Sequence, residues 1–97
     1  MSIIFEVIDK TGRKIHLSNE RWRHIRKRHP EVEEYDSIVD ALMRPDKVTN
    51  YHIDESIVYY YKYYKSRPSP DKYLLIVVKY LNGHGYVLTS YYEDKIR

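Results

Sequence analysis

The chain has 97 residues, a formal net charge of +3 and no cysteine. This length fits one domain spanning residues 1–97, and the lack of cysteine excludes disulfides, thiolate metal sites and cysteine nucleophiles. The N-terminus lacks the basic and apolar segments of a signal peptide, and the longest apolar run, Leu74 to Val78, is far too short to cross a membrane. We therefore expect a cytoplasmic protein with no membrane partner.

The N-terminal half predicts a hairpin followed by two helices. Ile3–Val7 alternates with polar neighbours as a half-buried strand does, and Lys14–Leu17 is the returning strand. Ser18 is a good N-cap for a helix over Asn19–His29, whose next residue is a proline that ends it. The apolar spacing predicts a second helix over Glu33–Met43.

The C-terminal half reads as strands joined by turns. The strand Lys72–Leu81 is the most apolar, so we expect it to be an inner strand, antiparallel to both of its neighbours. A turn is predicted over residues 82–85. The fold class is thus α+β, with an N-terminal hairpin and two helices packed on a four-stranded antiparallel sheet. The four expected strands are Lys47–Ile53, Ser56–Tyr64, Lys72–Leu81 and Tyr86–Tyr92.

Basic residues are concentrated in the first helix. From Arg13 to Arg28 there are seven basic residues and one acid, whereas Glu31 to Asp46 has six acids and one base. A surface polarised in this way favours a polyanion, and phosphate is the obvious candidate.

His24 shares one helical stripe with Arg21 and Arg28. Two guanidiniums would keep its imidazole neutral near pH 7 and ready to act as a base, while the arginines bind phosphate. The alternative is a solvated basic face without chemistry.

His29, at the end of the helix, is the second candidate for proton transfer. Its alternatives are a C-terminal cation favoured by the helix dipole, or a ring packed under Trp22. His24 and His29 are about 140° apart around the helix, which does not suit two ligands of one metal. We therefore expect no metal site and no cofactor. The other three histidines are expected to have ordinary structural roles, with His84 in a turn. They are His16, His52 and His84.

The predicted strand Ser56–Tyr64 is rich in tyrosine. Tyr61 shares a strand face with Tyr59 and Tyr63, and such a row could stack on nucleic-acid bases. The alternative is cross-strand aromatic packing.

The last predicted strand carries hydroxyl groups. Thr89 and Tyr91 are expected to point where Val87 points and to hold a phosphate oxygen or a catalytic histidine, although both types simply favour strands. Lys95 and Arg97 follow and would extend an anion-binding track.

Four segments, in this order, resemble one known family. They are Ile15 to Glu31 (IHLSNERWRHIRKRHPE), Arg44 to Val48 (RPDKV), Tyr73 to Lys79 (YLLIVVK) and Val87 to Tyr91 (VLTSY). Together they resemble the small stand-alone members of the phage barnase–EndoU–colicin–RelE-like (BECR-fold) nuclease family. The resemblance covers nearly the whole chain, from about residue 15 to residue 97.

The resemblance implies helices followed by a four-stranded antiparallel sheet. It also implies metal-independent RNA cleavage, in which the ribose 2′-OH attacks its own 3′ phosphate. The family's motif positions fall here on His24, Arg28, His29, Thr89 and Tyr91.

From residues and resemblance together, we expect an endoribonuclease that uses histidine acid–base catalysis and serves as the toxin of a toxin–antitoxin pair. Its partners would be RNA and an antitoxin protein. The alternative is a non-catalytic RNA- or protein-binding module on the same fold. The basic helix and the tyrosine-rich strand make sense in such a module without any chemistry.

Overall fold

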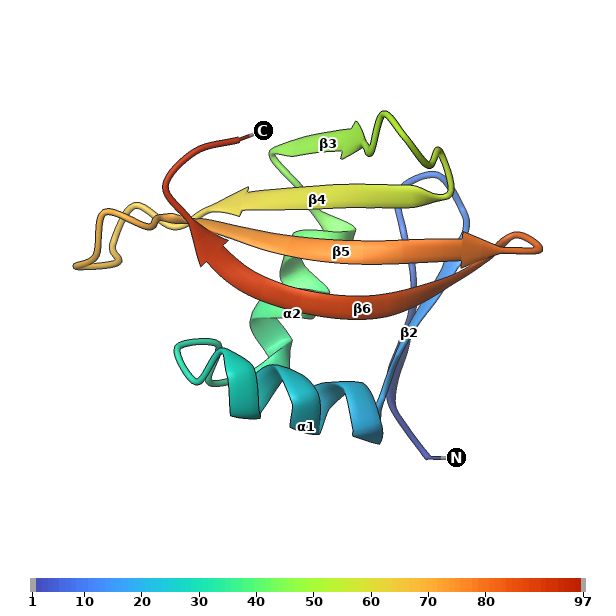
Figure 1. Ribbon diagram of the computed structural model, residues 1–97, viewed down its shortest axis with the longest axis horizontal. Helices are drawn as coiled ribbons and strands as arrows, with labels where there is room; N and C mark the ends of the chain where they lie inside the picture. The colour runs from blue at the N-terminus through green and yellow to red at the C-terminus, as the bar shows by residue number, and fades with distance from the viewer. Residues whose placement is uncertain (1, 97) are drawn as a thin grey trace.

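One mixed sheet organises the computed structural model, which describes residues 2–96. In the described chain the sheet has six strands in the order β1-β2-β6-β5-β4-β3. The two helices lie between β2 and β3 in the sequence (Figure 1). The elements are β1 (Ile3–Ile8), β2 (Lys14–Ser18), α1 (Asn19–Arg28), α2 (Tyr35–Met43), β3 (Lys47–Asn50), β4 (Ile57–Tyr63), β5 (Tyr73–Leu81) and β6 (His84–Glu93).

Strand β5 is an inner strand, as its composition predicts. It pairs antiparallel with β4 on one side and with β6 on the other. Leu74, Ile76 and Val78 are all 0 % exposed, and they contact the core beneath the helices. Burial of such side chains is the main favourable term in folding, so this strand forms the centre of the core.

The expected four-stranded antiparallel sheet is wrong, although the α+β class holds. The N-terminal hairpin does not pack on the sheet but extends it, because β2 pairs with β6 in parallel. Residues Lys14 to His16 lie opposite His84 to Tyr86. Pairing between strands so distant in sequence leaves no local pattern, whereas hairpin strands are separated by recognisable turns.

The extra length of β6 comes from a tight turn. Asn82 and Gly83 both have positive φ, 55° and 77°, as a two-residue type I′ hairpin turn requires. The expected turn over residues 82–85 is therefore too long, and His84 is the first residue of β6 rather than a turn residue. This places His84 on the edge to which β2 pairs.

Gly85 lies where the hairpin joins the rest of the sheet. A Cβ at this position would be 2.9 Å from Ile15 Cγ1 and 2.9 Å from the Tyr80 ring. We predict that Gly85→Ala destabilises the fold by about 1–3 kcal/mol, the usual cost of overpacking a core. Urea denaturation checks this, with Ser66→Ala in an exposed loop as control. Equal stabilities of the two variants would contradict so close an approach.

Helix α1 begins where the sequence predicts. The Ser18 hydroxyl accepts a hydrogen bond from the Arg21 backbone N–H at 3.2 Å, and Ile25 is buried against the sheet. Trp22 packs edge-to-face on Tyr35 with ring centroids 5.6 Å apart, so it contacts α2 and not His29. Helix α2 begins two residues later than predicted because Glu34 is extended.

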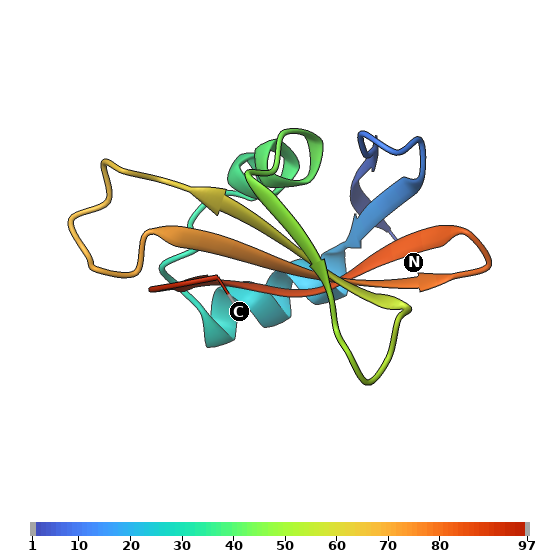
Figure 2. The same ribbon diagram turned by 90° about the horizontal axis from the view of Figure 1, so that it is seen from above.

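The two helices leave one face of the sheet uncovered. Helix α2 lies behind the sheet, and α1 runs along the border next to β6 (Figures 1 and 2). We call the helix-free side the open face. It carries the residues that alternate with the core positions, including Tyr59, Val77 and Lys79. In the described chain neither helix is long and apolar enough to cross a membrane.

A buried polar cluster connects the N-terminal hairpin of β1 and β2 to strands β4 and β5. The Asp9 carboxylate, 4 % exposed, accepts hydrogen bonds from the Tyr60 hydroxyl at 2.7 Å and the Tyr80 hydroxyl at 3.3 Å. Its other oxygen accepts from the backbone N–H of Thr11 and of Arg13. Burial raises the pKa of this carboxyl, but the hydrogen bonds from Thr11, Tyr60 and Arg13 outweigh it and hold the pKa at about 2.

Candidate functional site

A β-bulge decides which side chains of β6 reach the open face. Val78 pairs with Val87 but Val77 pairs with Thr89, so Leu88 is an extra residue on β6. An extra residue reverses the alternation of faces beyond it. Val87 is therefore in the core, whereas Thr89 and Tyr91 lie on the open face. The expectation that all three point the same way is wrong.

The open face brings His29 and Tyr91 together. Their rings stack with centroids 4.9 Å apart and an interplanar angle of 26°. His29 is the C-cap of α1, where its backbone N–H donates to the Ile25 carbonyl at 2.7 Å. The fold thus brings the end of the basic helix and the last strand together at two of the positions that the sequence singles out. His29 is neither packed under Trp22 nor freely solvated.

A carboxylate lies beside the His29 ring. Glu31 Oε2 is 3.8 Å from His29 Nδ1, and the side chains are 39 % and 30 % exposed. The pair becomes an ion pair when the imidazole is protonated, and Nε2 remains as the second nitrogen that can exchange a proton. Stacking, backbone capping and the acid hold this ring in place while leaving part of it accessible to a ligand.

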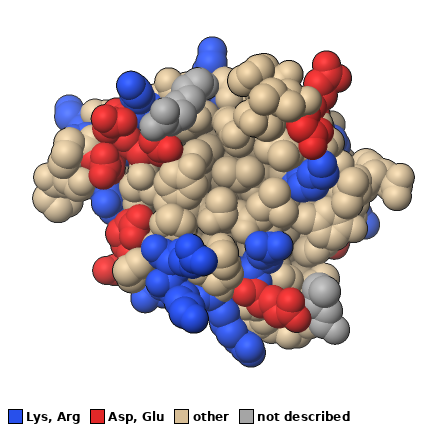
Figure 3. Space-filling view, viewed as in Figure 1, with Lys and Arg blue, Asp and Glu red and all other residues tan. Residues whose placement is uncertain are grey.

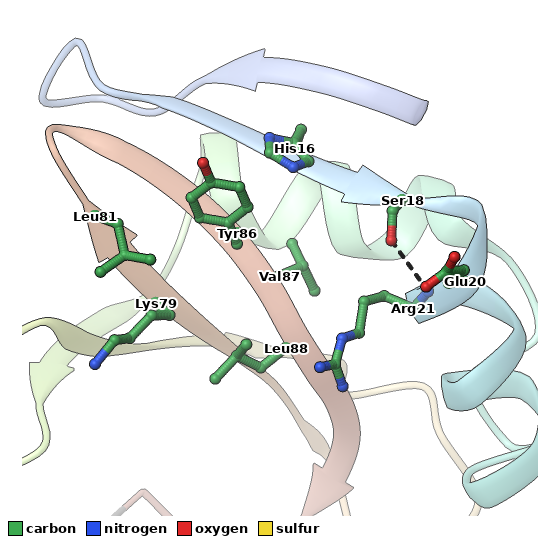
Figure 4. Close-up of a pocket in the computed structure, with 9 residues that line it drawn as sticks. All are labelled: His16, Ser18, Glu20, Arg21, Lys79, Leu81, Tyr86, Val87 and Leu88. Carbon is green, nitrogen blue, oxygen red and sulfur yellow. Dashed lines mark hydrogen bonds between the residues drawn. The ribbon is translucent and has the colours of Figure 1, made fainter. Parts of the chain in front are cut away.

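Arg21 lies about 12 Å from His29 along the helix axis. It lines a cavity of about 340 Å³ between the start of α1 and strands β5 and β6. In Figure 4 its guanidinium lies beside Leu88, the bulged residue, while Lys79 and Tyr86 form the opposite side. The separation of about 12 Å between Arg21 and His29 corresponds to roughly three or four phosphates of one strand at duplex spacing.

The directions in which Arg28 and His24 project follow from the same helical periodicity. Arg28 is two turns from Arg21 and about 20° away around the axis, so it projects to the same side of α1. His24 is about 60° from Arg21 and is exposed. No described side chain holds the His24 ring, whereas His29 is stacked. Figure 3 shows lysine and arginine side chains gathered along the border of the open face that α1 occupies.

Thr89 lies on β6 between the bulged residue Leu88 and Tyr91. Its Oγ1 is buried without a hydrogen-bond partner among the described residues. Leaving such a group unsatisfied costs about 1–3 kcal/mol. Thr89 lies two residues from Tyr91 on the same strand face.

The remaining predicted residues are less well placed. Tyr61 is 0 % exposed although it lies on the open face, which leaves no ring surface for a base, so we do not retain it as a stacking residue. Lys95 is exposed in the segment that turns back across the open face after β6 (Figure 1). Arg97 lies outside the described residues.

Two histidines with no predicted functional role, His16 and His84, lie close together at the other border of the open face. His16 Nδ1 and His84 Nε2 are 2.6 Å apart, and Tyr86 packs on both rings. Burial and the nearby His84 lower the pKa of His16, and Glu6 opposes them. Only the parallel pairing of β2 with β6 creates this contact, so no spacing in the sequence signals it.

Comparison with known proteins adds no relative. The chain matches no protein-family model, no curated protein and no solved structure at a significant level. A functional proposal therefore depends on the site itself and on the resemblance of the four sequence segments.

Proposed function

We propose that this protein is a metal-independent endoribonuclease that acts on its open face next to α1. The observation that carries the proposal is the stacking of His29 on Tyr91, with ring centroids 4.9 Å apart, at the end of the basic helix that carries Arg21 and Arg28. It joins an ionisable ring, an aromatic hydroxyl and phosphate-binding cations on one surface. The toxin role and the antitoxin partner rest on the sequence resemblance alone.

The chemistry needs few groups. The ribose 2′-oxygen attacks phosphorus, the bond to the 5′-oxygen breaks, and a 2′,3′-cyclic phosphate and a 5′-hydroxyl result. A base accepts the 2′-OH proton, an acid gives a proton to the leaving 5′-oxygen, and cations stabilise the pentacoordinate phosphate. Histidine can perform both proton transfers, and arginine can supply the charge.

We assign the proton transfer at the scissile phosphate first to His29. A ring that packing holds in place loses less entropy on reaching the reactive geometry than an exposed ring such as His24. Tyr91 would position His29, and Arg28 would stabilise the phosphate. Thr89 Oγ1 is buried and therefore not accessible to RNA. Arg21 would bind a phosphate farther along the strand. His24, about 60° around α1 from Arg21, is the candidate for the second proton transfer.

The rival function is an RNA-binding module without catalysis. The cavity beside Arg21 and the basic border of α1 would serve such a module equally well. Total RNA incubated in EDTA separates the two functions. We expect fragments with the wild-type protein and intact RNA with the double variant His24→Ala/His29→Ala. Intact RNA with both proteins would favour the binding module.

RNA affinity is expected to fall steeply with added salt, because arginines bind phosphates mainly by releasing counterions. Arg21→Glu and Arg28→Glu should each weaken binding and lower the log–log salt slope by about 0.7, the single-strand value per contact. Filter binding across a salt series measures this. Arg44→Glu is the matched control, because Arg44 is 77 % exposed at the end of α2 and pairs with Asp40. The same loss in all three variants would show that RNA does not dock on α1.

A further inference from the structure

Three strands bring potential metal ligands together at the border of the open face. Glu6 on β1 pairs with His16 on β2, and His16 pairs in parallel with Tyr86 on β6. His84 lies two residues before Tyr86 and therefore on the same face. The ligand atoms of Glu6, His16 and His84 all lie within 4.8 Å of one another.

We propose that Glu6, His16 and His84 form a binding site for a divalent transition-metal ion of the zinc class. Two imidazoles and one carboxylate are a known ligand set for zinc with one position left open. The expectation of no metal site considered only spacing along α1, and these ligands come from three strands instead.

The geometry needs only a small adjustment to hold an ion. Zinc binds imidazole nitrogen at about 2.0–2.1 Å, so two such ligands in a tetrahedral site are roughly 3.3 Å apart. His16 Nδ1 and His84 Nε2 are 2.6 Å apart, and rotation of either ring would separate them enough. Tyr86 limits that rotation, because its ring centroid lies 4.5 Å from His16 and 5.2 Å from His84. The partly exposed rings and the exposed Glu6 leave the ion a path of entry.

The surroundings suggest what the open position would face. His16 and Tyr86 line the cavity that also contains Lys79 and Arg21 (Figure 4). A metal-bound water or an anion would therefore lie at the border of a partly basic cavity. Because the ligands come from β1, β2 and β6, the ion would connect the N-terminal hairpin to β6. The site is separate from His29 and does not rest on the proposed ribonuclease activity.

Calorimetric titration of the metal-free, untagged full chain with zinc chloride tests the site. We expect one zinc ion per chain, and a melting temperature that rises by about 10 °C or more when free zinc is a hundredfold above its Kd. His16→Ala and His84→Ala should each weaken binding by more than the 10- to 100-fold typical of losing a group behind a ligand. Glu6→Gln should also weaken binding, and His52→Ala is the control.

Nuclear magnetic resonance of the histidine rings in the wild-type chain tests the site without any substitution, so it does not depend on whether a variant folds. In the wild-type chain, zinc should shift the ring signals of His16 and His84 and leave those of His24 and His52 in place. Retention of wild-type affinity in both alanine variants would overturn the proposal. So would zinc-induced shifts confined to other histidines, or the absence of any zinc binding.

Discussion

Replacing His29 with alanine is expected to lower the rate of RNA cleavage by about 10²–10⁴-fold, the usual contribution of a positioned acid or base. Its ring is held against Tyr91 and next to Glu31, so it is the best positioned of the two candidate histidines. Single-turnover cleavage of a labelled RNA measures the rate without product release. His24→Ala should give a smaller loss, because an exposed ring is less well positioned.

Controls separate catalysis at His29 from its role at the helix end. A purely structural His29 would lower the melting temperature of the His29→Ala variant and leave the rate per folded molecule unchanged. Tyr91→Leu removes the stacking ring while keeping bulk, so it should slow cleavage less than loss of His29 itself. Affinity for an uncleavable 2′-deoxy analogue should barely change in His29→Ala. Full activity in both single histidine variants and in the double variant would remove histidine from the mechanism.

Replacing Asp9 with alanine is expected to lower the free energy of unfolding by about 3–5 kcal/mol, because each buried donor left without an acceptor costs about 1–3 kcal/mol. The carboxylate accepts from the hydroxyls of Tyr60 and Tyr80 and from two backbone amides. Urea denaturation measures the loss, with the exposed Glu55→Ala as control. A loss within about 0.5 kcal/mol, as for ordinary surface changes, would contradict the role of this cluster.

The same carboxyl gives a pH dependence with a definite sign. Its folded pKa of about 2 lies below the ordinary value of 3.8, so the charged form is favoured by folding. Its contribution of about 2 kcal/mol is complete above pH 5 and is lost as the pH falls toward 2. Asp9→Asn should lack this component. Asp54, which pairs with Lys79 at 2.8 Å, titrates in both proteins and cancels in the difference. Parallel pH profiles for wild type and Asp9→Asn would refute the assignment.

Local patterns predict most of the elements. The N-cap at Ser18 and the apolar run of β5 both specify structure within a few neighbouring residues, and the structure agrees with them. The stripe of Arg21 and Arg28 likewise depends only on helical periodicity, so its direction toward the open face follows once α1 is placed.

Two features that leave no local signal in the sequence account for the differences between the predicted and the observed structure. The parallel pairing of β2 with β6 joins segments about 70 residues apart, and it brings His16 to His84. The bulge at Leu88 adds one residue to β6 and reverses the side of the sheet on which Thr89 lies. A strict two-residue alternation places Thr89 with Val87, in the core, whereas the structure places Thr89 on the open face. Strand pairing and bulges depend on tertiary contacts, which a single sequence does not display.

The most direct test of metal-independent cleavage is the product formed from a defined single-stranded RNA in EDTA. The wild-type protein should give fragments ending in a 2′,3′-cyclic phosphate, paired with fragments starting in a 5′-hydroxyl. A single 2′-deoxy substitution at the cleaved position should abolish the cut, because it removes the attacking oxygen. Cleavage that persists at the 2′-deoxy position, or that requires an added divalent ion, would contradict attack by the 2′-OH with histidine as the proton-transfer group.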